Sequence, residues 1–191
     1  MNKEKYFFDK EVFSKGYEFK FHVDEELLDT ILRLKRKGKV LDIGVGDNGT
    51  SLKLAKLGFD VACIDISPIC IRAIKEKAKK ENIRINTLCC DIENFKWKES
   101  YDIIIATGVF HFLTKDKVKA FLNKIKGHTK SKGLNVIEVF LKGSACEEES
   151  DGYYFSENEI MRTYTAWKVV QHEVYKDDDG NLCEFLIVLK N

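Results

Sequence analysis

The sequence lacks a surplus of either charge, and this absence bears on its partners. It holds 32 Lys and Arg residues against 31 Asp and Glu residues, a formal net charge of +1. Domains that bind nucleic acid or an anionic membrane usually carry a basic patch, so neither partner is expected. The densest basic run, residues 33–39, falls where a helix should end, and we interpret it as a solvated last turn.

Long apolar runs are also missing. No stretch reaches the roughly 18 residues that a membrane-spanning helix needs. The N-terminus, Met1 to Lys5, is charged and has no signal-peptide core. With 191 residues and an apolar share of 44%, the chain suits one globular domain, residues 1–191, without repeats or a low-complexity linker. We expect a cytoplasmic monomer or homodimer.

The cysteine pattern shows no metal-binding spacing. The chain has six cysteines but no C-x-x-C pair and no His/Cys spacing of a zinc site, so no metal is expected. Cys63, Cys89 and Cys183 lie in apolar strand-like runs, where a free cysteine behaves as a small hydrophobe. Reduced, buried thiols are therefore predicted.

Short apolar runs alternate with helical stretches, which favours a parallel sheet covered on both faces. Strands are predicted at residues 39–43, 61–65, 86–90, 101–106 and 134–140, and helices at 24–37, 50–57, 67–81 and 115–129. The pair Ser67-Pro68 is a strong helix start, because serine caps the first turn and proline suits the first helical position.

The pattern changes after Phe140. An acidic loop, residues 142–156, precedes a capping box at residues 156–159 that opens a helix towards Trp167. Two further β-rich runs, residues 167–175 and 182–190, flank a hairpin turn at residues 177–181. The predicted fold class is α/β, a single doubly wound, mostly parallel seven-stranded sheet with a C-terminal antiparallel hairpin. This order of elements resembles the Rossmann-like class I methyltransferases.

An acidic residue precedes the glycine turn that follows the first strand. Residues 40–46 run from an apolar strand through Asp42 into Gly44 and Gly46, the way an α/β sheet forms a nucleotide crevice. A dinucleotide pyrophosphate at this turn would be repelled by Asp42 and Asp47. S-adenosylmethionine has an ammonium and a sulfonium and no phosphate, so a carboxylate here suits it better. The third glycine of the methyltransferase motif falls on Asn48, which tolerates left-handed backbone.

Two more acids lie at the carboxyl ends of the next two predicted strands. Asp65 lies about 20 residues beyond the first glycine, the offset at which an acid binds ribose hydroxyls in either cofactor. Asp91 follows the third strand, where methyltransferases commonly bind the adenine amino group and pack the ring on the next apolar residue, here Ile92. Three acids at the ends of three neighbouring strands predict one ligand crevice.

The fourth strand ends near the predicted site. Residues 107–110 lack the proline-aromatic motif of methyltransferases that act on DNA-base amines, so nucleobase methylation is disfavoured. His111 is a candidate general base, although a histidine between Phe110 and Phe112 is also typical of a packed or capping residue.

Motifs along nearly the whole chain resemble the tellurite-resistance (TehB-like) methyltransferases. The matching segments are residues 6–10, the glycine turn with Thr50-Ser51, residues 107–113, His128-Thr129, residues 155–159 and residues 178–181. The resemblance implies S-adenosylmethionine as cofactor, bound by Lys10, Asp42, Gly44, Gly46, Asp65, Ile66, Asp91, Ile92 and Thr107. It also implies a small-molecule methyl acceptor, with tellurite and selenite among the suggested substrates. Residues 1–24 are expected to form a lid, with the loop 142–156 near the site.

The chain departs from the family near the hairpin. The family's His-Arg pair and further arginine suit a small oxyanion, whereas this chain has Tyr175-Lys176 and then Leu182. His111, Tyr175 and Lys176 are the candidates for assisting an acceptor that carries a proton. A regulatory protein that binds S-adenosylmethionine without catalysis and an NAD-dependent oxidoreductase remain as alternatives.

Overall fold

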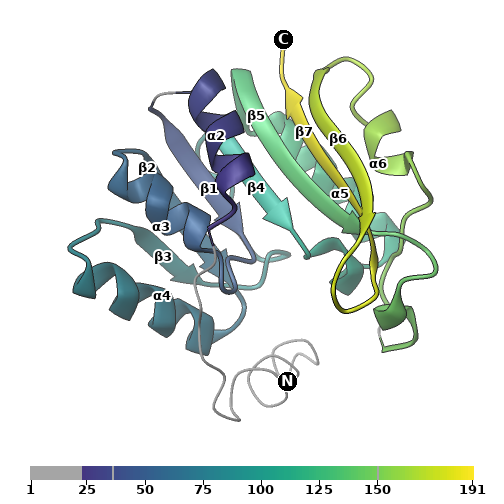
Figure 1. The fold of residues 1–191 in the computed structure, drawn as a ribbon, viewed down its shortest axis with the longest axis horizontal. Helices are drawn as coiled ribbons and strands as arrows, with labels where there is room; N and C mark the ends of the chain where they lie inside the picture. Colours follow the sequence, from purple (N-terminus) through teal and green to yellow (C-terminus); the bar gives the residue numbers. More distant parts are fainter. Residues whose placement is uncertain (1–22, 36, 150) are drawn as a thin grey trace. The chain divides into compact units, whose positions relative to one another are not determined.

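The computed structural model describes residues 23–35, 37–149 and 151–191. The described residues contain seven strands in a mostly parallel sheet whose last strands are antiparallel, which confirms the predicted fold class (Figure 1). The chain divides into two compact units, Met1–Phe95 and Lys96–Asn191. The expectation of a single domain stays a prediction.

The first unit is a parallel three-stranded layer with helices. Its elements are α2 (Glu25–Leu34), β1 (Lys39–Ile43), α3 (Gly49–Lys56), β2 (Asp60–Asp65), α4 (Pro68–Lys80) and β3 (Asn86–Cys89). Strand β2 lies between β1 and β3 and pairs in parallel with both. Helix α3 packs against β2, and α4 packs against β2 and β3 (Figure 1).

Burial in the first unit follows the apolar runs of the sequence. Val40, Leu41 and Ile43 of β1 are fully buried, as is Cys63 of β2. Strand β3 is exposed along most of its length, and Cys89 is exposed with it. The prediction of a buried thiol is therefore right for Cys63 and Cys183 and wrong for Cys89, because β3 pairs with β2 on one side only within its unit.

The helix starts of the first unit form through side-chain caps. The Ser67 hydroxyl accepts hydrogen bonds from the N–H groups of Ile69 and Cys70, and Pro68 occupies the first helical position. Asp24 caps α2 in the same way through Leu27 N–H. Helix α2 ends at Leu34, before the predicted end at residue 37, and Arg33 lies in its last turn as interpreted from the sequence.

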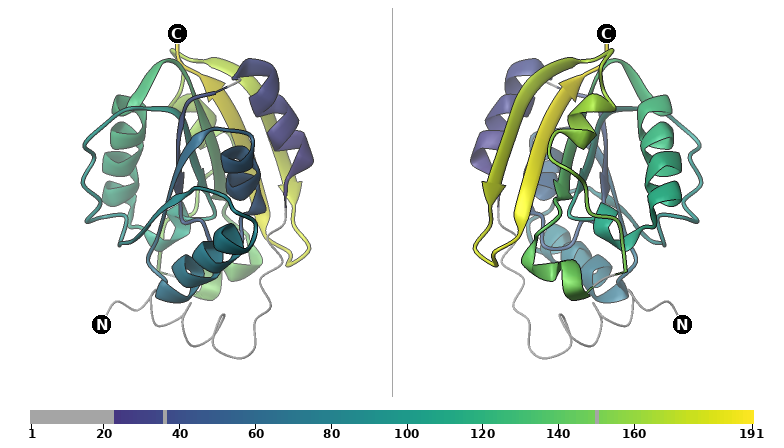
Figure 2. Two further views of the ribbon diagram at one scale, coloured as in Figure 1. Left: turned by 90° about the vertical axis from the view of Figure 1, so that its left-hand side faces the viewer. Right: turned by 90° about the vertical axis from the view of Figure 1, so that its right-hand side faces the viewer.

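The second unit joins a parallel pair of strands to an antiparallel hairpin. Its elements are β4 (Tyr101–Thr107), η2 (Phe110–Phe112), α5 (Lys115–Gly127), β5 (Thr129–Phe140), η3 (Ala145–Glu149), α6 (Glu159–Arg162), β6 (Lys168–Lys176) and β7 (Leu182–Leu189). Strand β5 pairs in parallel with β4 and antiparallel with β7, which pairs with β6. Figure 2 shows β6 and β7 side by side in its right-hand view, with α6 beside β7.

Two elements of the second unit differ from their predicted bounds. Strand β5 begins at Thr129 instead of residue 134, because Thr129 pairs with Tyr101 before the register shifts. Helix α6 has only four residues and does not continue towards Trp167. Glu159 accepts the Ser156 N–H as a capping box requires, but Asn158 is left-handed with φ 61° and gives no side-chain cap.

The predicted hairpin turn is confirmed. Gly180 has a φ of 88°, a conformation that favours glycine. Asp177 accepts the Asn181 N–H at 2.7 Å and the Asn181 side-chain amide at 3.0 Å. One aspartate and one asparagine therefore close the connection between β6 and β7. None of the described helices is long and apolar enough to cross a membrane.

The caps of α4 and α5 offer a matched stability test. Ser67→Ala removes an observed cap, so it should lower the free energy of unfolding by about 1 kcal/mol. Thr114 precedes α5 without a side-chain cap bond, so Thr114→Ala should cost only a few tenths of a kcal/mol. Urea unfolding of both variants measures the difference. Equal losses would contradict the assignment of the Ser67 cap.

Candidate functional site

The glycine turn after β1 adopts the conformation that its glycines allow. Gly44 and Gly46 have φ values of 72° and 47°, which strain residues with side chains. Asn48 does not need the left-handed conformation that its residue type would tolerate. Its φ is −78°, and its side-chain oxygen accepts the Thr50 N–H at 2.9 Å, so it caps α3. Asn48 thus fits the third glycine position as a helix cap.

Asp42 is buried next to this turn, with 1% of its surface exposed. One of its oxygens, Oδ2, accepts the Ser51 hydroxyl at 2.6 Å and the Asn48 side-chain amide at 3.0 Å. The other, Oδ1, is buried and has no hydrogen-bond partner among the described residues. A buried carboxylate oxygen without a donor is costly, which makes it a natural acceptor for a ligand.

Burial also changes the protonation of Asp42. Burial, assisted by the nearby charge of Asp65 and opposed by the Ser51 and Asn48 hydrogen bonds, raises the pKa of this carboxyl to about 7. Asp42 is therefore divided between its acid and carboxylate forms near neutral pH. A cationic partner would favour the carboxylate.

Asp65 holds the glycine turn in place from the end of β2. Its Oδ2 accepts the Gly46 N–H at 2.9 Å, and its Oδ1 accepts the Ser67 N–H at 2.8 Å. The side chain is 7% exposed. The structure thus brings Asp42, Asp65 and the glycine turn together as predicted, although their binding roles stay predictions.

Asp91 follows β3 and shapes the next turn. Its side-chain Oδ1 accepts the Glu93 N–H at 2.9 Å, and its carbonyl accepts the Asn94 N–H. The Cys90 N–H donates to the Asp65 carbonyl at 2.8 Å, which ties this turn to the end of β2. Ile66 and Ile92, the apolar residues after Asp65 and Asp91, are half-buried. Asp91 and both isoleucines lie at the carboxyl ends of the strands of the first unit.

The second unit has its own group of candidates at the carboxyl ends of β4 and β5. Thr107 ends β4 and is paired in register with Glu138 of β5. Tyr175 donates its hydroxyl hydrogen to Glu138 at 2.7 Å. Tyr175 is also opposite Cys183, which is opposite Phe140, so these side chains share one face of the sheet.

His111 packs on this same face. Its ring stacks on Phe140 with 4.5 Å between centroids, and it also contacts Phe112. Burial lowers its pKa to about 4, so the imidazole is neutral at pH 7. This packing favours a structural role over a general base, the second of the two interpretations that the sequence left open. A catalytic role for His111 stays a prediction.

Tyr175 and Lys176 are neighbours in β6 and lie on opposite faces of the sheet. Adjacent residues of a strand point to opposite faces, so Lys176 faces away from the side that carries Tyr175 and Glu138. The surroundings of Tyr175 are acidic. Burial and the charges of Glu138 and Asp177 raise the pKa of Tyr175, and the same causes raise the pKa of Cys183 to about 12.

The acidic loop 142–156 is fastened to the hairpin. The Cys146 N–H donates to the Asn181 side-chain oxygen at 3.0 Å, and the Leu182 N–H donates to the Ser144 hydroxyl at 3.0 Å. The Tyr154 hydroxyl donates to the Cys146 carbonyl at 2.7 Å. These bonds place the loop beside the turn that follows Tyr175. Its role near a bound ligand stays a prediction.

Three polar residues of these groups are not predicted from the sequence as site residues. Asn48 and Ser51 appear there only as turn and motif positions, and Glu138 only as part of a strand. The available signal for Asn48 and Ser51 is a buried acid that lies six and nine residues before them, respectively, ahead of a helix start. Nothing in the sequence pairs Glu138 with Tyr175. Lys10 and residues 1–22 of the expected lid lie outside the described residues.

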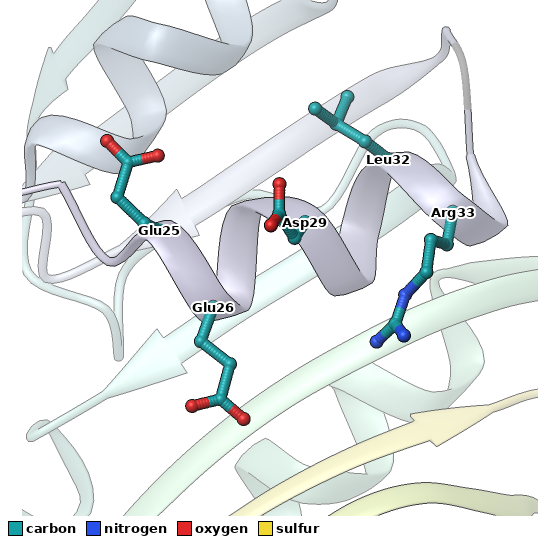
Figure 3. Close-up of a pocket in the computed structure, with 5 residues that line it drawn as sticks. All are labelled: Glu25, Glu26, Asp29, Leu32 and Arg33. Carbon is teal, nitrogen blue, oxygen red and sulfur yellow. The ribbon is translucent and has the colours of Figure 1, made fainter.

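A pocket along α2 contains none of the predicted site residues. It is lined by Glu25, Glu26, Asp29, Leu32 and Arg33 (Figure 3). The acids lie towards the N-terminus of the helix and Arg33 near its C-terminus, which complements the helix dipole. Arg33 also donates to the Thr30 hydroxyl at 2.9 Å. In the described residues, no group of three or more His, Cys, Asp or Glu side chains is placed to hold a metal ion.

The strand order within each unit, the glycine turn and the acid before it define the class I methyltransferase fold. Solved structures agree. Magnesium protoporphyrin IX methyltransferase from Synechocystis PCC 6803, solved with bound S-adenosylmethionine, has a TM-score of 0.70 over 87% of this chain and 77% of its own. It is 15% identical in sequence, so this likeness concerns the fold alone.

The family model described as Tellurite resistance protein TehB matches residues 5–185, and the chain belongs to this family. It is 34% identical over 151 residues to a Haemophilus influenzae protein described as a probable S-adenosyl-L-methionine-dependent methyltransferase TehB, covering 75% of this chain and 52% of that protein. The crystal structure of TehB from Haemophilus influenzae has a TM-score of 0.75 at 27% identity, covering 98% of this chain and 67% of that one. The chain spans about half the length of the curated TehB relatives it matches.

The raised pKa of Asp42 predicts a pH-dependent stability in the ligand-free protein. The folded-state pKa of about 7 exceeds the ordinary value of 3.8, so Asp42 stabilises the fold below pH 3.8 and this contribution is lost as pH rises through 7. Asp42→Asn removes the titration. Compared with this variant, the wild type should lose stability between about pH 4 and 8, by up to about 1.4 kcal/mol for each tenfold fall in proton concentration.

Urea unfolding at several pH values measures this difference. Asp60→Asn is the matched control, because Asp60 is exposed at the start of the neighbouring strand β2. Its stability should follow the wild type at every pH. A constant difference between the wild type and Asp42→Asn would show that Asp42 has an ordinary pKa in the fold.

Proposed function

We propose that the chain transfers a methyl group from S-adenosylmethionine to a small-molecule acceptor. The observation that carries the proposal is the buried Oδ1 of Asp42, which lacks a donor among the described residues beside a glycine turn. An ammonium group supplies both the donor and the positive charge that this oxygen needs. The curated relatives described as probable S-adenosyl-L-methionine-dependent methyltransferases support the same cofactor and reaction.

The residues of the first unit would bind and orient the cofactor. Asp42 would accept the ammonium, Asp65 the ribose hydroxyls and Asp91 the adenine amino group, with Ile66 and Ile92 against the ring. Gly44 and Gly46 keep side chains away from the turn. S-adenosylmethionine, when bound, supplies a methyl group that its sulfonium has already activated. The protein's main task is then to hold donor and acceptor in line, an effect worth about 7 to 11 kcal/mol of barrier.

The same geometry argues against a dinucleotide. A pyrophosphate at the turn would meet Asp42 and the neighbouring Asp47, and both charges oppose a phosphate. The Gly46 N–H, which a phosphate would require, already donates to Asp65. The charge and the hydrogen bonds of the turn therefore favour S-adenosylmethionine over NAD.

The second unit supports an acceptor that is not an oxyanion. Tyr175 stands where the family resemblance places a histidine of an oxyanion grip, and it donates to Glu138. Burial raises the pKa of both Tyr175 and Cys183, and the nearby negative charges of Glu138 and Asp177 act in the same direction. An oxyanion would be repelled here, whereas an amine or a neutral thiol would not. We therefore favour a small molecule whose nucleophilic atom is uncharged, such as a neutral thiol or the unprotonated form of an amine, as the acceptor.

Cofactor binding gives the first test. S-adenosylmethionine at 100 times its Kd should raise the free energy of unfolding by about 2.7 kcal/mol. Asp65→Ala should weaken binding by about 1.5 to 3 kcal/mol, the scale of hydrogen bonds to a charged group. Asp60→Ala, at the opposite end of the same strand, should leave binding unchanged. Calorimetric titration measures the affinities of the wild type and both variants for S-adenosylmethionine and for NADH. Binding of NADH without binding of S-adenosylmethionine would overturn the proposal.

Acceptor discrimination gives the second test. S-adenosylhomocysteine formation should be measured with selenite, 2-phenylethylamine and 2-phenylethanethiol. The amine or the thiol should react faster than selenite in the wild type, and Glu138→Gln should narrow that difference because it removes one negative charge. Asp178→Asn removes a charge from the exposed hairpin tip and is the matched control. Faster reaction of selenite would contradict the proposed acceptor class, and turnover of any acceptor excludes a purely regulatory protein.

A further inference from the structure

The N-terminus of α3 supplies both hydrogen bonds that Asp42 receives. Ser51 lies in the first turn of α3 and donates its hydroxyl to Asp42 Oδ2 at 2.6 Å. Asn48 caps the same helix and donates its side-chain amide to the same oxygen at 3.0 Å. Two donors on one oxygen and, among the described residues, none on the other make an asymmetric carboxylate.

Asn48 connects the helix start to the carboxylate through both ends of its amide. The amide oxygen accepts the Thr50 N–H, and the amide nitrogen donates to Asp42. These two bonds fix the orientation of the side chain, because exchanging its oxygen and nitrogen would break both. A glycine at this position would form the turn without providing the donor.

We propose that Asn48 and Ser51 are positioning residues, which hold Oδ2 of Asp42 so that Oδ1 is left as the acceptor for the cofactor's ammonium. This inference rests on the proposed function. It explains why the buried acid has described donors on one oxygen only. It also explains how the chain works with an asparagine where the motif has a glycine.

The groups around Asp42 determine how its pKa should respond to each substitution. Within the first unit, Asp65 of β2 is the charged group that acts on it, and it raises the pKa of Asp42. Cys63 of β2, its register partner, is a neutral thiol because burial raises its pKa. From α3, the two contacts are the uncharged Asn48 and Ser51, and both lower the pKa of Asp42. Loss of either donor should therefore raise that pKa further.

The experiment measures the affinity for S-adenosylmethionine against pH in the full chain. The wild type should lose affinity as pH falls through about 7, where Asp42 takes up its proton. Ser51→Ala should bind about tenfold more weakly at pH 8, the effect of losing one hydrogen bond to a charged group. Its pH midpoint should also move to a higher value. Asn48→Ser should shift the midpoint in the same direction while keeping a residue type that caps helices well.

A second readout needs no ligand. Titration of the Asp42 side-chain carboxyl by ¹³C nuclear magnetic resonance should show a higher midpoint in Ser51→Ala and Asn48→Ser than in the wild type. Thr50→Val is the matched control. Thr50 is buried between the two positions and accepts the Asp24 N–H, with no bond to Asp42. This variant should lose stability without moving either midpoint.

The outcomes separate the two proposals. If the wild type binds S-adenosylmethionine but the variants keep its affinity within twofold and keep both midpoints, the positioning role is wrong and the proposed function stands. If the wild type does not bind the cofactor at any pH, the proposed function itself fails. A shift of the midpoints with Thr50→Val as large as with Ser51→Ala would also overturn the positioning role, because it would mark a general loosening of the helix start.

Discussion

The burial of one carboxylate is the constraint on which the candidate site depends. Asp42 belongs to a strand whose other inner positions are apolar, and a charge there is costly unless it is compensated. At the start of α3, Ser51 and Asn48 donate hydrogen bonds to one of the two carboxylate oxygens. This group lies beside the glycine turn, which the bond from Gly46 to Asp65 holds, and beside the capped start of α3. In the proposed function, the positively charged ammonium of the cofactor completes the arrangement.

The sequence predicted the parts of the fold that follow from strong local patterns. Three such patterns are the acids at the carboxyl ends of β1, β2 and β3, the Ser67-Pro68 helix start and the Asp177–Asn181 turn. Their positions in the structure agree with the predictions. The sequence indicated only that Asn48 tolerates left-handed backbone, whereas in the structure it is an ordinary helix cap.

What could not be predicted depends on contacts between distant residues. Thr129 joins β5 because Tyr101 pairs with it across the sheet, which no local pattern reveals. Helix α6 stops after one turn although its capping residues resemble those of a longer helix. The link between Tyr175 and Glu138 crosses an intervening strand. The burial of His111 likewise depends on Phe140, which lies far along the chain.

The fastening of the acidic loop to the hairpin has a consequence for how this fold diversifies. Asn181 and Ser144 hold the loop and the turn together through backbone groups, so the attachment tolerates changes in most of the side chains around it. The residues assigned to the cofactor all precede Phe95, apart from Thr107. The side chains that the hairpin presents, such as Tyr175, can therefore change without altering the residues proposed to bind the cofactor. The choice of methyl acceptor can then diversify while the same proposed cofactor residues are kept.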